Sequence, residues 1–170
     1  MKTVTREAGQ FAQQEALIFK GQLQQGLREA ARYHNEAVFG IHTDESRLET
    51  YTKSAGAALD ALKYARKFAE TSGRDLNDMG TVSDTVHKLA SRAVSSSLSA
   101  ATIAFNNLHD YEKAKDAVIV ALSATVEARF VPKERSEIGR QRRLYSLDES
   151  INAAIRRSSA SQFAAVARVK

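Results

Sequence analysis

The sequence predicts an all-α protein, an antiparallel four-helix bundle followed by a basic C-terminal extension that carries a terminal helix. Three observations favour this class. The 170 residues include one proline and eight glycines, the two residues that cost a helix interior most. Apolar residues recur at steps of three and four along most of the chain. The run Ala117–Val126 carries no charge on any side, so we expect it to be the middle of a buried central helix.

The first helix should run from about Thr5 to Phe39, because apolar residues follow helical spacing through this segment. Gly21 and Gly26 interrupt it, and each glycine costs roughly 1 kcal/mol relative to alanine in a helix interior. We therefore expect close approach of another helix at these glycines, or a kink or break between them. A phosphate-binding loop is disfavoured, because no strand precedes the glycines and no Gly-Lys-Ser/Thr ending follows them.

The second helix should begin at Ser46, since Ser46 and Glu49 have the spacing of a capping box. It should end at Ser72, with Gly73 as its C-terminal cap. Between these ends, the apolar positions alternate steps of three and four, which indicates a seam that packs on neighbouring helices. The seam consists of Leu48, Tyr51, Ala55, Ala58, Leu62, Ala65 and Ala69.

A loop is expected over residues 74–80, followed by a third helix capped by Thr81 with Asp84 three residues later. Alanine and serine dominate this helix, which should let it pack closely on others. Residues 106–110 are the expected break before the fourth helix, with Asp110 as its N-cap; the alternative is one continuous, bent helix. That helix should end before Pro132, because the residue preceding a proline is biased away from helical geometry.

The chain divides by charge into a body of residues 1–130 and a basic arm of residues 131–170. Residues 1–128 contain 15 Lys/Arg and 16 Asp/Glu, a net of −1, whereas residues 129–170 contain 10 and 4, a net of +6. A terminal helix should open at Ser146, which has capping-box spacing to Glu149. Its apolar face of Ile151, Ala154 and Ile155 is weak, so we expect it to dock peripherally or on a neighbouring subunit.

This charge asymmetry predicts contact with nucleic acid or another polyanion. Arginine forks match phosphate geometry, and Tyr145 is available for stacking on a base. No helix-turn-helix, zinc-finger or RNP-type pattern is visible, so sequence-specific recognition is not expected. A solvated basic helix face is the alternative interpretation. The candidate nucleic-acid-binding residues are Lys133, Arg135, Arg140, Arg142, Arg143, Arg156 and Arg157.

One pattern favours an enzyme. Arg28 and His34 stand in an Arg-x5-His arrangement on the first helix, which resembles the motif of HEPN-type ribonucleases. That resemblance implies a dimer cleft in which His34 acts as acid or base and Arg28 stabilises the phosphorane charge. The motif covers seven residues. Its alternative is an exposed helix face whose charges pair with Glu29 and Glu36.

Other chemistry has little support in the sequence. Cysteine is absent, which excludes thiolate catalysis, disulfides and cysteine-ligated metals. The four histidines show no His-Glu-x-x-His spacing, and Asp84 with His87 forms a single copy where a di-metal bundle needs paired motifs. We therefore expect no metal, no cofactor, no small-molecule substrate and no catalytic residue. No secretory signal or stretch of roughly 20 apolar residues is present, so a cytoplasmic protein without membrane contact is expected.

Taken together, the sequence predicts a non-enzymatic, self-associating helical protein whose basic C-terminal segment contacts nucleic acid or another polyanion. The first alternative is a structural or assembly subunit, such as a phage-type virion or packaging component, without direct nucleic-acid binding. The second alternative is the HEPN-like ribonuclease. The alanine and serine seams and the separate basic arm favour a homo-oligomer in the first two cases.

Overall fold

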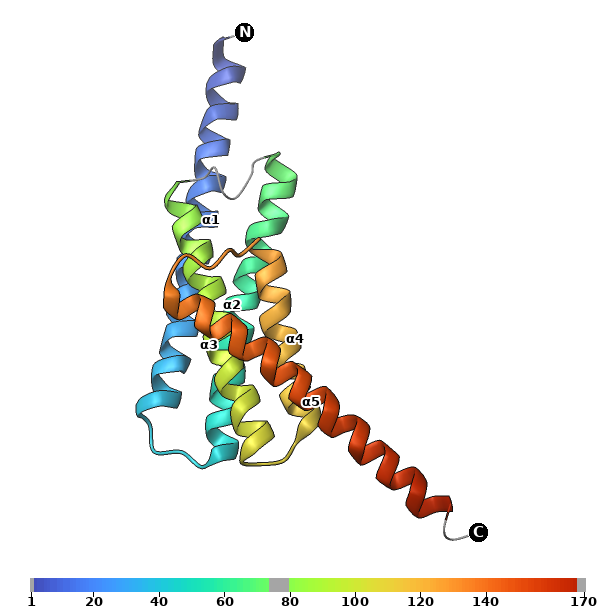
Figure 1. Cartoon of the computed structure of the whole chain (residues 1–170). Coiled ribbons are helices and arrows are strands. Elements are labelled where there is room, and N and C mark those ends of the chain that lie inside the picture. The colour runs from blue at the N-terminus through green and yellow to red at the C-terminus, as the bar shows by residue number, and fades with distance from the viewer. Residues whose placement is uncertain (1, 74–79, 168–170) are drawn as a thin grey trace.

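The computed structural model describes residues 2–73 and 80–167, with side chains described at residues 14–73, 80 and 82–160. Within this part of the chain every regular element is a helix, which confirms the all-α class (Figure 1). The predicted loop at residues 74–80 lies outside the described residues except for Gly80. The five helices are α1 (Lys2–Phe39), α2 (Asp44–Ser72), α3 (Thr81–Asn106), α4 (Tyr111–Glu127) and α5 (Arg135–Ala167).

The central helix is α3, which packs against each of the other four helices. The prediction that Ala117–Val126, now part of α4, forms the centre was wrong. One side of that segment is buried through Val118 and Ala121, but Ile119 is 49% exposed and Val126 is 65% exposed. A lack of charge therefore did not mean burial on all sides. α3 occupies the centre because its small residues let several helices come close; Ala90, Ala93, Ala100, Ala101 and Ala104 are all fully buried.

α1 is one continuous helix through both of its central glycines, so the predicted break is absent. At Gly26, an added Cβ would lie 2.5 Å from the Cβ of Ala61 on α2, whereas at Gly21 nothing lies within 4 Å. Gly26 is thus the close-approach position and Gly21 is not. The seam predicted for the second helix is confirmed in full, since all seven of its residues, which lie on α2, are buried.

The helix ends follow the predicted signals in part. Gly73 caps α2 with a φ of 65°, and the Asp110 carboxylate accepts from the Lys113 N–H at 3.0 Å to cap α4, as expected. The N-cap of α2 is Thr43 and not Ser46: Thr43 Oγ1 accepts from the Ser46 N–H at 3.2 Å. At α3 the cap position is Gly80, which makes no side-chain cap bond.

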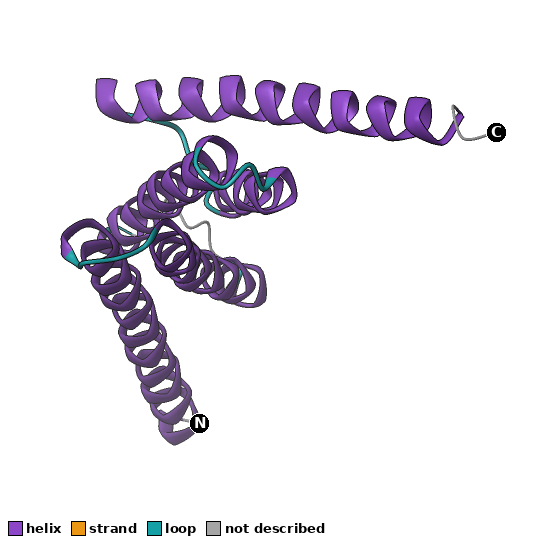
Figure 2. Cartoon of the chain, turned by 90° about the horizontal axis from the view of Figure 1, so that it is seen from below, coloured by secondary structure: helices purple, strands orange, loops and turns teal. Residues whose placement is uncertain are grey.

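α5 begins at Arg135, eleven residues before the predicted start at Ser146, and runs unbroken through Gly139. The basic segment is therefore helical from its beginning. α5 lies obliquely across α3 and α4 on one side of the other helices, and its C-terminal part extends beyond them (Figures 1 and 2). It is anchored by Leu144 and Ile151, both fully buried. Leu144 carries much of the docking that the sequence placed only on Ile151, Ala154 and Ile155.

Candidate nucleic-acid interface

The N-terminus of α5 is fixed by an acidic residue in the middle of the basic segment. Glu137, only 6% exposed, accepts at Oε2 from the N–H groups of Lys133 and Glu134, at 2.9 and 3.2 Å. Lys133 and Glu134 immediately precede α5, and a glutamate three residues after the cap residue commonly binds that residue's N–H. The other oxygen, Oε1, lies 3.0 Å from Nε2 of His87 on α3. Glu137 therefore both starts α5 and ties it to α3.

The electrostatics of this contact favour an ionised Glu137. Burial by itself raises the pKa of this carboxyl, but the hydrogen bonds from the N–H groups of Lys133 and Glu134, that from Ser91 and the charge of His87 together hold the pKa below its usual value. A carboxylate that accepts several hydrogen bonds is stabilised in its charged form. This acid is consequently engaged within the molecule and does not offset the arginines at the surface.

A second acid of α5 also faces the other helices. Asp148 Oδ1 lies 2.6 Å from Nζ of Lys115 on α4, and both side chains are less than a third exposed. Together with Leu144 and Ile151, these contacts fix the rotation of α5 about its own axis. The exposed acids near the basic residues are reduced to Glu134 and Glu149.

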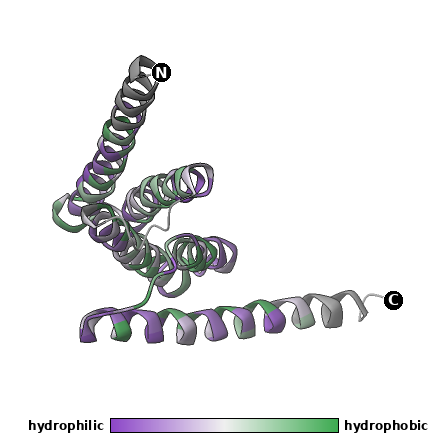
Figure 3. Cartoon of the chain, turned by 90° about the horizontal axis from the view of Figure 1, so that it is seen from above, coloured by the Kyte–Doolittle hydropathy of each residue, from purple (hydrophilic) through white to green (hydrophobic). Residues whose placement is uncertain are grey.

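The opposite side of α5 presents most of the predicted cations to solvent. Arg135 and Arg142 are seven residues apart, or two helical turns, so they project in nearly the same direction. Hydrophilic residues recur along the part of α5 that Figure 3 colours by hydropathy. We call the exposed set the outward basic face. It consists of Lys133, which lies just before α5, and of five arginines on α5: Arg135, Arg142, Arg143, Arg156 and Arg157.

The cations of this face are little engaged by acids of the same molecule. Within the described part of the chain, no ion pair joins Lys133, Arg135, Arg142, Arg143 or Arg156 to a carboxylate. Two of the arginines bond along their own helix: Arg156 Nε donates to the Asn152 carbonyl and Arg157 Nε to the Ala153 carbonyl, each at 3.3 Å. Tyr145 is 50% exposed on α5, where it can stack on a base.

Arg140 is the predicted site residue that lies apart from this face. It is half-buried, and its Nη2 donates to Oγ of Ser91 on α3 at 3.4 Å. Sequence spacing within a basic cluster could not show this, because Arg140 lies roughly 140° around the helix from Arg135 at 100° per residue. The structure therefore separates one arginine from the six residues of the outward basic face.

The proposed ribonuclease pair is not brought together within the chain. His34 Nδ1 lies 2.9 Å from Oγ of Ser96 on α3, and the His34 ring meets Tyr51 edge-on. Arg28 is exposed, and its Nε donates to the Gln24 carbonyl of its own helix. Six residues on a helix separate two side chains by about 120°, which places them on different faces.

His34 instead ends a chain of buried hydrogen bonds between three helices. Ser54 Oγ donates to the Ala30 carbonyl at 2.7 Å and lies 2.9 Å from Ser96 Oγ. The Ser54 proton is thus used, so Ser96 must donate to Ser54 and His34 Nδ1–H must donate to Ser96. Burial, and then the charge of Arg92, lower the pKa of His34. The arrangement is that of a neutral histidine joining α1, α2 and α3.

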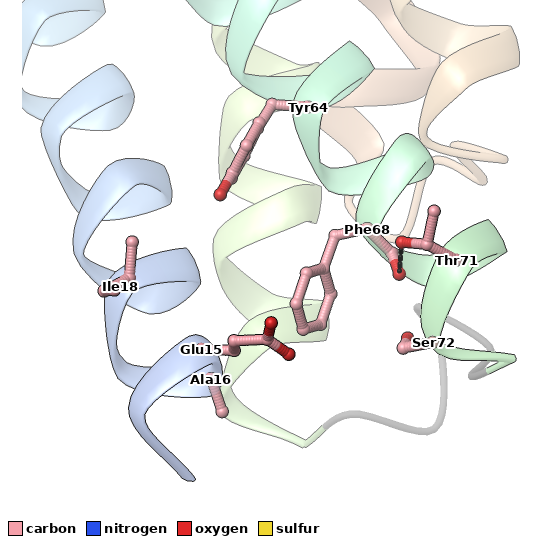
Figure 4. Close-up of a pocket in the computed structure, with 7 residues that line it drawn as sticks. All are labelled: Glu15, Ala16, Ile18, Tyr64, Phe68, Thr71 and Ser72. Carbon is pink, nitrogen blue, oxygen red and sulfur yellow. Dashed lines mark hydrogen bonds between the residues drawn. The ribbon is translucent and has the colours of Figure 1, made fainter. Parts of the chain in front are cut away.

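The described residues offer little for other chemistry. A hollow of about 570 Å³ between α1 and α2 is lined by Glu15, Tyr64, Phe68 and Thr71, among others (Figure 4). Its Thr71 hydroxyl donates to carbonyls of its own helix. Among the described residues, no group of three or more His, Asp or Glu could hold a metal ion. No helix in the described ranges has the length and apolarity needed to cross a membrane.

Comparisons of this chain with protein-family models, with curated proteins and with solved structures found no match.

Proposed function

We propose that this protein is a non-enzymatic, self-associating helical protein that contacts nucleic acid, or another polyanion, through the outward basic face. In this proposal α1–α4 form an antiparallel four-helix body, and residues 131–170 form the basic extension that makes the contact. The proposed place of action is the cytoplasm. The observation that carries the proposal is the rotation of α5: its acids Glu137 and Asp148 contact α3 and α4, whereas the cations of the outward basic face are exposed to solvent.

Several features support binding to a phosphate backbone. From Arg135 to Arg157 the helix rises about 33 Å at 1.5 Å per residue, close to one turn of duplex DNA. A rigid helix that carries several arginines over this length can contact several phosphates at once. Such contacts release counterions and give affinity that falls steeply with salt. Because no base-reading pattern accompanies the arginines, the proposed binding is largely independent of sequence.

Point variants of the full chain test this proposal. A chain that ended at Phe130 would lose the buried Leu144 and Ile151, so truncation would confuse binding with folding. The test variant is Arg135→Gln, Arg142→Gln, Arg143→Gln and Arg156→Gln combined. Its matched control replaces four exposed lysines of α1 and α2 by glutamine: Lys20, Lys53, Lys63 and Lys67.

Both variants remove four positive charges, so they separate the position of the charges from the net charge. We expect the α5 variant to lose at least tenfold in affinity for a duplex oligonucleotide at physiological salt, while the lysine control loses much less. Equal losses in the two variants would mean that only net charge matters. Absence of binding by the unmodified protein would contradict the proposal.

The self-association in this proposal is supported by a groove of about 510 Å³ between the start of α2 and α4. Its lining combines Leu48 and Leu108 with three acids and one base: Glu45, Glu49, Asp116 and Lys113. An apolar groove whose lining carries a net negative charge suits a basic amphipathic helix of a second copy. Light scattering should then give a mass well above the 18.7 kDa of one chain. An oligomer that binds no nucleic acid would favour the structural or assembly alternative.

A further inference from the structure

A second group of cations lies on α3, away from the outward basic face. α1 and α5 both pack against α3 but, within the described residues, not against each other. α3 reaches α1 through Thr85 and Ser96, which bond Gln24 and His34. It reaches α5 through His87 and Ser91, which bond Glu137 and Arg140.

Between these two rows of contacts runs a strip of α3 that neither helix covers. Residues at spacing of three and four lie on one side of a helix, and this strip consists of Lys88, Arg92, Ser95 and Ser99. Lys88 is exposed and the other three are half-buried. We call it the α3 strip. Within the α3 strip, Arg92 lies between the contacts that α3 makes with α1 and those that it makes with α5.

Arg92 is a half-buried guanidinium that lacks an acidic partner. Within the described part of the chain it makes no hydrogen bond or ion pair, and neither do the hydroxyls of Ser95 and Ser99. A charge withdrawn from water is normally paired. The nearby acid Glu137 is engaged by His87, and the exposed Asp84 lies about 12 Å along the helix from Arg92 at 1.5 Å per residue.

A second guanidinium stands beside Arg92. Arg140 reaches α3 at Ser91, the residue next to Arg92 in the chain, and its Nη2 is held there at 3.4 Å from the serine hydroxyl. Burial, followed by the charge of Arg140, lowers the pKa of Arg92. Two like charges held together at a partly desolvated place repel each other, and an anion between them would relieve this repulsion.

We propose that Arg92 and Arg140 form a phosphate-binding site at the α3 strip, which takes the phosphate of a monoester, a diester or the free ion. Arginine forks bind phosphate oxygens in pairs, and Ser95 provides a neutral donor one turn from Arg92. Arg140 is oriented for this role by Ser91. The site does not depend on the outward basic face, because it uses a different side of α5 and a different helix.

The first experiment measures thermal unfolding while inorganic phosphate replaces chloride at constant ionic strength. We expect the Tm of the full chain to rise with phosphate, since a ligand that binds only the folded state stabilises it. Arg92→Gln and Arg140→Gln should abolish this rise, whereas the control Arg142→Gln should keep it. A Tm that is the same in phosphate and chloride, or equal responses of all three variants, would overturn the site.

A second readout separates the site from a merely structural role of Arg92. If Arg92 only packs, Arg92→Gln lowers the Tm in chloride. If it forms the site, removal of one repelling charge leaves the Tm in chloride unchanged or higher. Phosphate binding should also raise the pKa of the neighbouring His34, measured by NMR titration, because it neutralises Arg92. A Tm decrease in chloride together with an unmoved His34 would contradict the proposal.

A final arm distinguishes the source of the phosphate. A short oligonucleotide without terminal phosphates offers only diesters. If Arg92→Gln weakens both phosphate and oligonucleotide binding, the site takes a diester; if it weakens phosphate binding alone, the site takes a monoester or the free ion. Failure of the proposed function gives a different result from failure of this site. In that case the four-arginine variant of α5 would bind the oligonucleotide as well as the unmodified chain does, while the rise in Tm with phosphate would remain.

Discussion

At the scale of single residues, side-chain hydrogen bonds define where α2 and α5 begin. Two signals near the start of α2 suit a helix cap: Thr43, and the pair of Ser46 and Glu49. Thr43 is the cap of α2, whereas the Ser46 hydroxyl lies 3.0 Å from Nδ1 of His42. Glu137, an acid within the basic segment, is buried and accepts from the N–H groups of Lys133 and Glu134, the two residues just before α5. Several residue types near a helix start can cap it, and these hydrogen bonds identify the residues that do so in α2 and α5.

The buried hydrogen-bond chain gives a prediction for Ser96. Ser96→Ala should lower the free energy of unfolding by about 1–3 kcal/mol, because it leaves the Ser54 oxygen and His34 Nδ1 without their partner in the interior. Ser99→Ala, on the same helix and without a hydrogen bond within the described residues, should change it by less than about 0.5 kcal/mol. Urea denaturation of both variants measures the difference. Equal changes in the free energy of unfolding would mean that the hydrogen bonds of Ser96 do not stabilise the fold.

His34 gives a prediction for pH. Its pKa is lowered in the folded state, whereas in the unfolded chain it stays near 6.5. Below pH 6.5 the unfolded state therefore binds more protons, so stability is full above that pH and falls as the pH drops toward the folded pKa. Denaturation between pH 5 and 8 should show this loss, and His34→Gln should reduce it. If the stability of the unmodified chain did not fall as the pH is lowered from 8 to 5, a neutral, half-buried His34 would be contradicted.

At the scale of elements, periodicity predicted the helices well and their surroundings less well. The alternating seam of α2 is buried at every predicted position, because a 3.6-residue repeat determines which residues share a face. The uncharged run in α4 was a weaker guide, since α4 contacts the other helices on one side only. The start of α5 was missed because Glu134 and Glu137 do not form the serine or threonine pattern of a capping box.

The two central glycines of α1 provide a matched pair of variants. Gly21→Ala should stabilise the chain by about 0.5–1 kcal/mol, since alanine favours a helix and its Cβ meets nothing within 4 Å. Gly26→Ala should destabilise it by about 1–3 kcal/mol, because the new Cβ would lie 2.5 Å from that of Ala61. Chemical denaturation distinguishes them. Two changes of the same sign would contradict the close packing of α1 on α2 at Gly26.

Docking of α5 can be tested through its buried side chains. Leu144→Ala and Ile151→Ala should each cost about 2–5 kcal/mol, because both residues are fully buried. Ile138→Ala, at a residue that is 41% exposed, should cost much less. Loss of docking should also increase tryptic cleavage after Arg142 and Arg143. If all three variants behaved alike, α5 would not be held where the structure places it.

At the scale of the whole molecule, the sequence shows that the basic residues are concentrated in the C-terminal quarter of the chain. It does not show which of these side chains face solvent and which face the other helices. Counting charges placed the basic excess after residue 128. It could not show that Asp148 would pair with Lys115 or that Arg140 would turn toward Ser91. It also gave no signal for Arg92, a single cation within a helix of alanines and serines. The rotation of α5 depends on packing against α3 and α4, which no local pattern specifies.

The salt dependence of binding tests the central claim, that the outward basic face contacts a polyanion, most directly. The slope of log K against log salt is about −0.9 for each phosphate contact on duplex DNA. Neutralising four arginines of this face should therefore make the slope shallower by roughly 3 to 4, while the four-lysine control should leave it nearly unchanged. A four-arginine variant with the slope of the unmodified chain would contradict the claim.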